Sequence, residues 1–166
     1  MRHIVDTEDP EESSVLGTEG MTPENNGGLL IPDDRSSHSS EPQHPDPVQT
    51  FRLWQIFLDR VNPLTKIIHV PTLQPYIIEA TTDPSNVPLH YQPLLFTVYL
   101  MATLSLSEAE CHQLLGSSQA LALQRFSSAT RTALLRFDYL RNYDMAALQA
   151  LVLFMVCVLS FGLTRC

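Results

Sequence analysis

FRLWQIFLDRVNPLTKIIHVPTLQPYIIEA, residues 51–80, is the first stretch of the chain in which large apolar side chains become dense and periodic. Four of them share one face of a helix, at the spacing i, i+1, i+4 and i+8: Leu53, Trp54, Phe57 and Val61. A helix is therefore predicted over residues 49–61. Asn62-Pro63 is expected to end it, because the residue before a proline is driven out of the α region.

The second half of the same stretch predicts a short extended segment and then another helix. Residues 66–70 combine isoleucine and valine with one histidine and read as extended. Thr72 is the predicted N-cap of the helix that follows. Pro75 then falls early enough in this helix to be tolerated.

Three segments of this stretch, in this order, resemble the opening of a known family: Leu53-Trp54-Gln55-Ile56-Phe57, Val61-Asn62-Pro63-Leu64-Thr65-Lys66 and His69-Val70-Pro71-Thr72-Leu73. The family is the fungal-specific transcription factor domain, the middle homology region of fungal binuclear zinc-cluster (six-cysteine) regulators. The resemblance continues through residues 94–104, 107–116 and 148–151, and covers roughly residues 49–158.

This resemblance implies a non-catalytic regulatory domain that acts in the nucleus on transcription by RNA polymerase II. Zinc and contact with DNA are expected only in a six-cysteine cluster of the full-length protein, which this sequence does not contain. A small-molecule effector, a homodimer or a full-length relative are the implied partners. Such domains normally continue beyond residue 158, so residues 49–166 are expected to form the N-terminal part of the domain. The chain would then be a fragment, a truncated gene product or a natural short form.

The first 48 residues predict an acidic, proline-rich, disordered linker. They hold eleven acidic residues and two arginines, a charge of 2 − 11 = −9, which leaves +1 of the total of −8 for the rest. Such a composition cannot bury enough apolar surface to offset the loss of conformational entropy. An acidic activation segment is the alternative, although no aromatic residue precedes Phe51. Leu29-Leu30-Ile31, the one apolar cluster, could dock as a short strand.

Charge and cysteine content exclude several classes of function. A nearly neutral body behind an acidic leader offers no clustered lysine and arginine for DNA or for an anionic membrane surface. Cys111, Cys157 and Cys166 are far apart, with no C-x-x-C pair, so a structural zinc site is not expected. Unpaired cysteines without a signal peptide are typical of the cytosol or nucleus.

The rest of the sequence predicts an all-α fold. An apolar helix over residues 91–106 has almost no polar side and should be buried on most sides. Ser107 and Glu110 form a capping box, and Gly116 ends the helix that they begin. A further helix, capped by Ser117 or Ser118, is predicted to reach residue 137. Its expected core face comprises Leu123, Phe126, Ala129, Thr130, Ala133, Leu134 and Phe137.

The last predicted helix, capped by Asp144, leaves an alternative open. Met145–Leu163 carries no charge over 19 residues, which is long enough to cross a bilayer and would make the chain a single-pass membrane-anchored adaptor. Gln149 and Ala146-Ala147 favour packing in a helical bundle instead. Without further helices to cover it, this apolar helix is expected to make the chain self-associate or need a partner.

No catalytic residue and no metal ligand is predicted, and residues that would contact an effector remain unassigned. His69 is interpreted as a buried structural histidine. Glu108 and His112 can share a helix face but lack a third ligand, and Cys111 and His112 point about 100° apart on a helix. A small helical enzyme would need convergent polar residues that the pattern does not show.

Two further sets of residues are given structural rather than functional interpretations. Arg125, Arg131, Arg136 and Arg141 are spread around their helix, so a solvated surface is favoured over a nucleic-acid patch. Trp54 and Phe57 are interpreted as anchors of the core.

Overall fold

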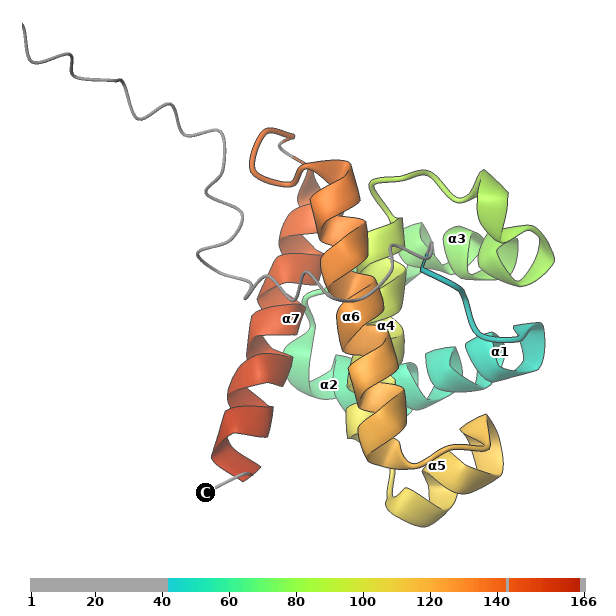
Figure 1. Ribbon diagram of the computed structural model, residues 1–166. Coiled ribbons are helices and arrows are strands. Elements are labelled where there is room, and N and C mark those ends of the chain that lie inside the picture. The colour runs from blue at the N-terminus through green and yellow to red at the C-terminus, as the bar shows by residue number, and fades with distance from the viewer. Residues whose placement is uncertain (1–41, 143, 165–166) are drawn as a thin grey trace, which may run out of the picture.

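The computed structural model describes residues 42–142 and 144–164, with side chains up to residue 160. All regular elements in this part are helical: α1 Pro47–Ile56, α2 Asn62–Thr65, α3 Val70–Thr82, α4 Gln92–Leu104, α5 Glu108–Leu115, α6 Gln119–Phe137 and α7 Met145–Thr164 (Figure 1). The predicted all-α class is confirmed. The acidic leader up to residue 41, with the strand proposed for residues 29–31, lies outside the described residues.

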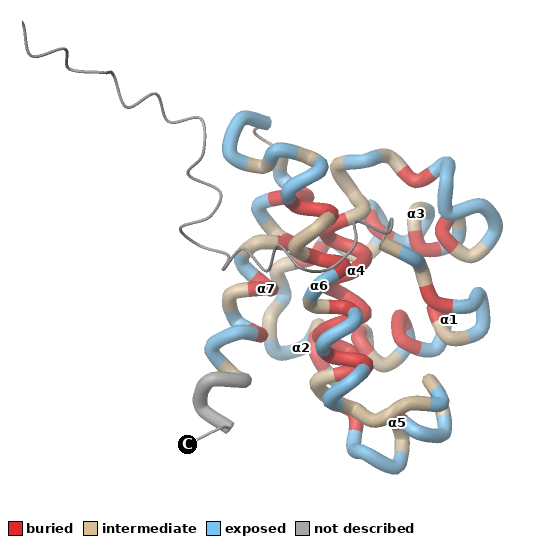
Figure 2. Tube along the Cα trace, viewed as in Figure 1, coloured by how far each residue is buried: buried red, intermediate tan, exposed pale blue. Residues whose placement is uncertain are grey.

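The central helix of the fold is α4, which packs against α6, α7 and α1. Every residue from Pro93 to Thr103 is buried, as the long red run in Figure 2 shows. The hydroxyl of Thr97 donates to the carbonyl of Pro93 at 2.7 Å, and that of Thr103 to Tyr99 at 2.8 Å. The helix is therefore buried, as its apolar composition predicted. Its two threonine hydroxyls are paired with backbone carbonyls of the same helix, so they are not left unsatisfied in the core.

Two long helices cover α4 along its length. In Figure 1, α6 runs back along α4 in the opposite direction, and α7 then runs down beside both. The residues that α6 buries repeat every three or four positions: Ala122, Leu123, Phe126, Ala129, Thr130, Ala133 and Leu134. The predicted core face of this helix is confirmed, except that Phe137 at its end is only half-buried.

The first helix does not end at Asn62-Pro63, so that prediction is wrong. α1 continues through a π-helical turn, Phe57–Val61, directly into α2. The wider turn places Pro63 in the first turn of α2, where its missing N–H is not needed. The helix ends instead at Lys66, whose left-handed backbone (φ 48°) lets its N–H donate to the carbonyl of Asn62 at 2.9 Å.

The start of α3 also differs from the prediction. The N-cap is His69, with φ −84° and ψ 100°, rather than Thr72, whose hydroxyl lies 2.7 Å from the Nδ1 atom of His69. His69 is exposed, so the expectation of a buried histidine is wrong. Pro71 explains the shift, because a proline fits the first turn of a helix and moves the start ahead of itself. Pro75 is tolerated inside the helix, as predicted.

The predicted caps of the later helices are confirmed. In the capping box of α5, Glu110 N donates to Ser107 Oγ at 3.3 Å, and Ser107 N to Glu110 Oε2 at 2.7 Å. Gly116 ends α5 with φ 69°. Ser118 caps α6 by accepting from Leu121 N at 3.3 Å.

The last helix has one buried and one exposed apolar side. Its buried stripe comprises Ala146, Ala147, Ala150, Leu153, Phe154 and Cys157. Asp144 Oδ1 accepts from Ala146 N at 2.8 Å, and Gln149 Nε2 donates to the carbonyl of Ile67 at 2.8 Å, which ties α7 to the segment before α3. The exposed side comprises Met145, Leu148, Val152, Val156, Val158 and Leu159. Within the described part of the chain, no helix is long and apolar enough to cross a membrane.

Candidate functional site

An open cleft of about 900 Å³ lies between the segment before α1, the turn after α3, the start of α4, and α6. We call it the His44 cleft. Its lining residues are Pro42, Gln43, His44, Pro84, Ser85, Gln92, Arg125, Ser128, Ala129 and Thr132. Within residues 42–142 and 144–164, the lining includes one positively charged side chain and no acidic one. The cleft is therefore suited to polar or anionic ligands rather than to cations.

His44 is held at the wall of the cleft by two aromatic neighbours in α4. Its ring centroid lies 4.5 Å from that of Phe96, and its Nδ1 atom lies 3.3 Å from the hydroxyl of Tyr99. Burial lowers the pKa of His44 to about 4, so its imidazole is neutral at pH 7. Sequence reasoning missed this residue, because it placed the whole of residues 1–48 in a linker.

A short polar chain fastens the His44 segment to the helices beneath it. The hydroxyl of Tyr99 lies 3.3 Å from His44 Nδ1, and Thr50 Oγ1 in α1 donates to the carbonyl of Pro45 at 3.2 Å. Tyr99 and Thr50 are fully buried, and burial raises the pKa of Tyr99 above its usual range. His44 and Pro45, which lie in the predicted linker, therefore pack against α1 and α4.

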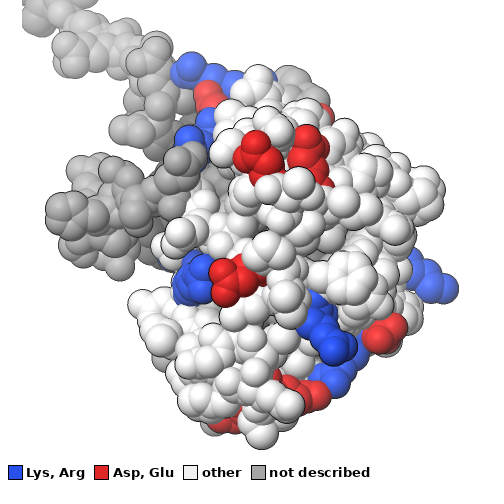
Figure 3. Space-filling view, turned by 90° about the vertical axis from the view of Figure 1, so that its right-hand side faces the viewer, with Lys and Arg blue, Asp and Glu red and all other residues white. Residues whose placement is uncertain are grey.

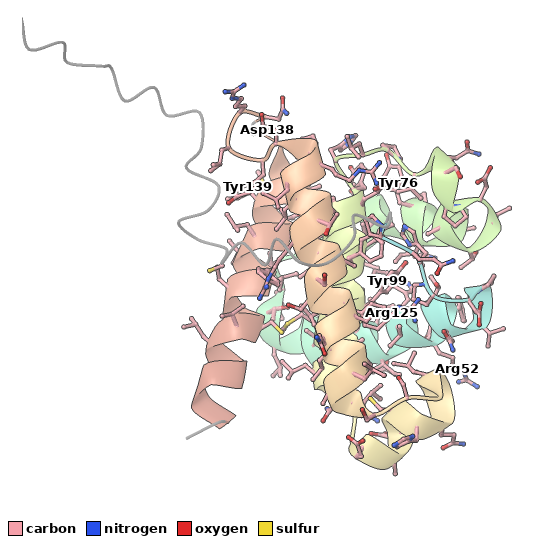
Figure 4. All side chains as sticks on the ribbon, in the orientation of Figure 1. Arg52, Tyr76, Tyr99, Arg125, Asp138 and Tyr139 are labelled. Atoms are coloured by element: carbon pink, nitrogen blue, oxygen red, sulfur yellow. The ribbon has the colours of Figure 1, made fainter. Side chains whose placement is uncertain are left out.

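Arg125 supplies the positive charge of the cleft. Its guanidinium carbon lies 5.5 Å from the centroid of the Phe126 ring, and its Nη2 atom lies 3.5 Å from the carbonyl of Gln43. Figure 4 labels Arg125 on α6 and Tyr99 on α4. Both contacts of Arg125 are weak ones, so most of its five N–H donors remain available to a ligand.

The carboxylate and histidine that were predicted to share a face of α5 do so. His112 Nε2 lies 3.4 Å from Glu108 Oε1, and both side chains are exposed. Glu108 Oε2 also accepts from Gln119 N at 3.1 Å, which supports the start of α6. In residues 42–142 and 144–164, no group of three histidine, cysteine or acidic side chains is placed to hold a metal ion.

Cys111, Trp54 and Phe57 all lie in the core. Cys111 is a free, fully buried thiol whose pKa is raised by burial, whereas the adjacent His112 is exposed, so the two do not form a reactive pair. The rings of Trp54 and Phe57 stack with centroids 5.9 Å apart and an interplanar angle of 8°. Their interpretation as core anchors is confirmed.

The four arginines of α6 and the loop after it do not form one basic surface. Arg131 packs its guanidinium 6.0 Å from the ring centroid of Phe154 in α7, and Arg141 Nε lies 3.6 Å from Asp138 Oδ2. Arg125 instead lines the cleft. On the face drawn in Figure 3, lysine and arginine side chains lie beside aspartate and glutamate rather than in a continuous patch. The contacts support the interpretation that these arginines do not act as a nucleic-acid patch.

A second, smaller hollow of about 290 Å³ lies at the start of α7. Its lining residues are Tyr139, Asn142, Asp144, Met145, Ala147, Leu148 and Leu151. The hydroxyl of Tyr139 is buried there without a hydrogen-bond partner in the described structure. This hollow is mostly apolar and continues the exposed side of α7.

Comparison with known proteins shows similarity to fungal regulators. The Pyriculol/pyriculariol biosynthesis cluster transcription factor 1 of Pyricularia oryzae is 44% identical over 160 residues, which are 94% of this chain and 21% of that protein. The Aurofusarin cluster transcription factor aurR2 of Gibberella zeae is 39% identical over 145 residues, 87% of this chain and 21% of that protein. The chain therefore spans about a fifth of the length of these relatives.

A more distant relative is named for a C6 finger domain. The C6 finger domain transcription factor adaR of Aspergillus niger is 29% identical over 120 residues, 71% of this chain and 15% of that protein. No family model matches the chain. No solved structure matches it either.

Proposed function

We propose that this chain is part of the non-catalytic regulatory region of a fungal zinc-cluster transcription factor, acting in the nucleus on transcription by RNA polymerase II. The observation that carries the proposal is the 44% identity to a named cluster transcription factor across 94% of the chain. The all-α body, with an open polar cleft between its helices, is compatible with a regulatory rather than a catalytic role. A small helical enzyme is the weaker alternative, because the relatives at 38–44% identity are named as transcription factors or regulators.

Contact with DNA, and the zinc that it needs, would belong to a six-cysteine cluster elsewhere in the full-length protein. The cysteines Cys111 and Cys157 are buried in different helices and are not metal ligands in the described structure. We place the regulatory body from residue 42 onward, since Pro45 and Thr50 pack into it, and leave the acidic leader as a linker.

The inputs of this region would be a small-molecule effector in the His44 cleft and a partner on the exposed side of α7. A second copy of the chain or a full-length relative is the proposed partner. Because two of the most similar relatives are named for biosynthesis or product clusters, we propose that the target genes form such a cluster.

A segment exchange tests the proposal. The matching segment of about 160 residues in the Pyricularia oryzae factor is replaced by this chain, and transcripts of the genes that the factor controls are measured. We expect the exchanged factor to retain regulated transcription, whereas deletion of the segment abolishes the regulation. The control is the same exchange carrying Phe126→Asp, which places a charge at a fully buried position. An exchanged factor that is stably expressed but behaves like the deletion contradicts the proposal.

A further inference from the structure

We infer that the His44 cleft binds a small organic carboxylate that also carries hydroxyl groups. This inference deepens the proposed function by naming the ligand class, and only the regulatory meaning of the ligand rests on that function. Binding itself is a property of residues 42–132 and can be measured on the isolated chain.

The charge of the cleft selects an anion. Among the lining residues that the structure describes, Arg125 is the one that carries a charge. A guanidinium offers parallel N–H donors that match the two oxygens of a carboxylate, so a bidentate pair is available. The Phe126 ring, 5.5 Å from the guanidinium carbon, holds Arg125 in place without neutralising its charge.

Unpaired polar side chains around the cleft select hydroxyl groups on the ligand. The side chains of Ser85, Gln92 and Ser128 line the cleft, and none of them makes a hydrogen bond to another described residue. They come from the turn after α3, the start of α4 and the middle of α6, so they surround a ligand rather than form one row. Hydroxyls and amides both donate and accept, which matches the hydroxyl groups of a ligand better than a bare anion.

His44 adds a directional contact. Its Nδ1 atom is already engaged with the hydroxyl of Tyr99, and the ring is held by its tilted packing against Phe96, with centroids 4.5 Å apart. In the neutral imidazole, the Nε2 atom is left to exchange one hydrogen bond with a ligand. Because the ring carries no charge at pH 7, it does not add to the attraction of Arg125 for an anion.

The size of the cleft favours a ligand larger than an inorganic ion. About 900 Å³ lies in the range of sites that hold whole metabolites, whereas an inorganic ion would fill a small part of it. Pro42, Pro84 and Ala129 give the cleft apolar wall segments, against which the carbon skeleton of an organic acid can pack. A single cation is too little for a nucleic acid, which needs several phosphate contacts.

The test uses the complete chain and two simple probes of nearly equal shape. Salicylate carries a carboxylate and a hydroxyl on one ring, and salicylamide replaces the carboxylate by a neutral amide. Calorimetry and the NMR signals of the His44 ring report binding. We expect salicylate to bind saturably and at least about tenfold more tightly than salicylamide. Arg125→Gln should remove this preference, whereas Arg52→Gln, on the exposed side of α1, should leave it unchanged.

Two results overturn the inference. One is equal binding of salicylate by the chain and by its Arg125→Gln variant. The other is the absence of saturable binding of both salicylate and citrate at concentrations up to about 10 mM. This range covers even a weak site, with a dissociation constant of about 1 mM. Failure here, with regulated transcription kept in the segment exchange, rejects the ligand site and leaves the proposed function standing. Binding of salicylate by a chain that fails in the exchange supports the site and rejects the function.

Discussion

His44 and Tyr99 are 55 positions apart in the chain, yet the Nδ1 atom of His44 lies 3.3 Å from the Tyr99 hydroxyl. The contact joins the segment ahead of α1 to the central helix of the fold. It also withdraws an imidazole from water, and Phe96 covers one side of the ring at 4.5 Å. The wall of the cleft is therefore set by a half-buried, uncharged histidine.

The stability of the chain should fall as the pH falls from about 6.5 to about 4. Burial lowers the pKa of His44 from 6.5 to about 4, so between these values the unfolded chain binds a proton that the folded chain does not. The contribution of the neutral ring is complete above pH 6.5 and is lost once the pH has passed the folded pKa. Its size is about 2 kcal/mol, after allowance for the solvent that reaches the partly exposed ring.

Urea unfolding at a series of pH values, on the chain and on its His44→Gln variant, measures this contribution. We expect the difference in free energy of unfolding between the two to shrink as the medium becomes more acidic within the window. Carboxylates titrate in both proteins and cancel in the difference. A difference that stays constant from pH 7 to pH 4 contradicts the assignment of a buried, neutral His44.

Local chemistry explains what the sequence could predict about this fold. The continuous apolar composition of Pro93–Thr103 predicts burial on all sides, and the structure buries every one of these residues. The Ser107–Glu110 box and Gly116 act within their own turns, so they can be recognised without knowing the rest of the fold.

The features that the sequence could not predict all depend on distant contacts. The π-helical turn that carries the chain past Pro63 lies where Arg60 reaches α4 and α5, 45 and 50 positions away. The cleft brings together residues 42–44, 84–85, 92 and 125–132, none of which forms a motif by itself. His44 has no local signal, because its partners Phe96 and Tyr99 belong to another helix.

Arg60→Lys should loosen α5 while leaving the rest of the fold intact. Arg60 donates to both carboxylate oxygens of Glu110, at 3.2 and 2.6 Å, and to the carbonyl of Ser105 at 3.0 Å. A lysine cannot form this bidentate ion pair with Glu110 and also donate to the carbonyl of Ser105. We expect faster amide hydrogen exchange in Glu108–Leu115, measured by NMR, and no change in α6. Arg52→Lys on α1 is the matched control.

The same ion pair makes a prediction for acid solution. The hydrogen bonds from Arg60, followed by those from Ser107, lower the pKa of Glu110 from 4.5 to about 2. The folded carboxylate is thus favoured above pH 4.5, and its contribution is lost as the pH falls through 2. In a carboxyl NMR titration, Glu110 should keep its charge below pH 4 in the chain. In the Arg60→Lys variant its pKa should rise, but it should stay below the ordinary value because the hydrogen bonds from Ser107 remain.

Substitution by alanine should lower the stability of the chain strongly at one residue of α7 and hardly at all at its neighbour. Leu153 is fully buried, whereas Val152 is 41% exposed on the apolar side that no described residue covers. Leu153→Ala should cost about 2–5 kcal/mol of unfolding free energy through the cavity that it leaves. Val152→Ala should change it by less than about 0.5 kcal/mol, since alanine favours a helix. Urea unfolding distinguishes the two, and equal losses would show that α7 is rotated.

Gly116→Ala tests the end of α5 through the backbone alone. Gly116 has φ 69°, and a Cβ atom added there would meet nothing within 4 Å. The expected loss of about 1 kcal/mol therefore comes from the left-handed conformation and not from a clash. Gly116→Asn should lose less, because asparagine adopts this conformation more readily than alanine. Equal stability of the alanine and glycine proteins in urea would contradict the positive φ.

The purified chain should not bind DNA with sequence specificity. After residue 48, eight lysine and arginine residues face seven acidic ones, 8 − 7 = +1, and Arg60 and Arg141 are paired with acidic side chains of the fold. Binding to phosphates requires clustered cations, and their contribution weakens steeply with salt. A gel shift with the target promoters of a related factor should show no band for this chain at physiological salt. A chimera that carries the zinc cluster of that factor should bind them, and a specific shift by the chain alone would overturn the assignment of DNA contact to the cluster.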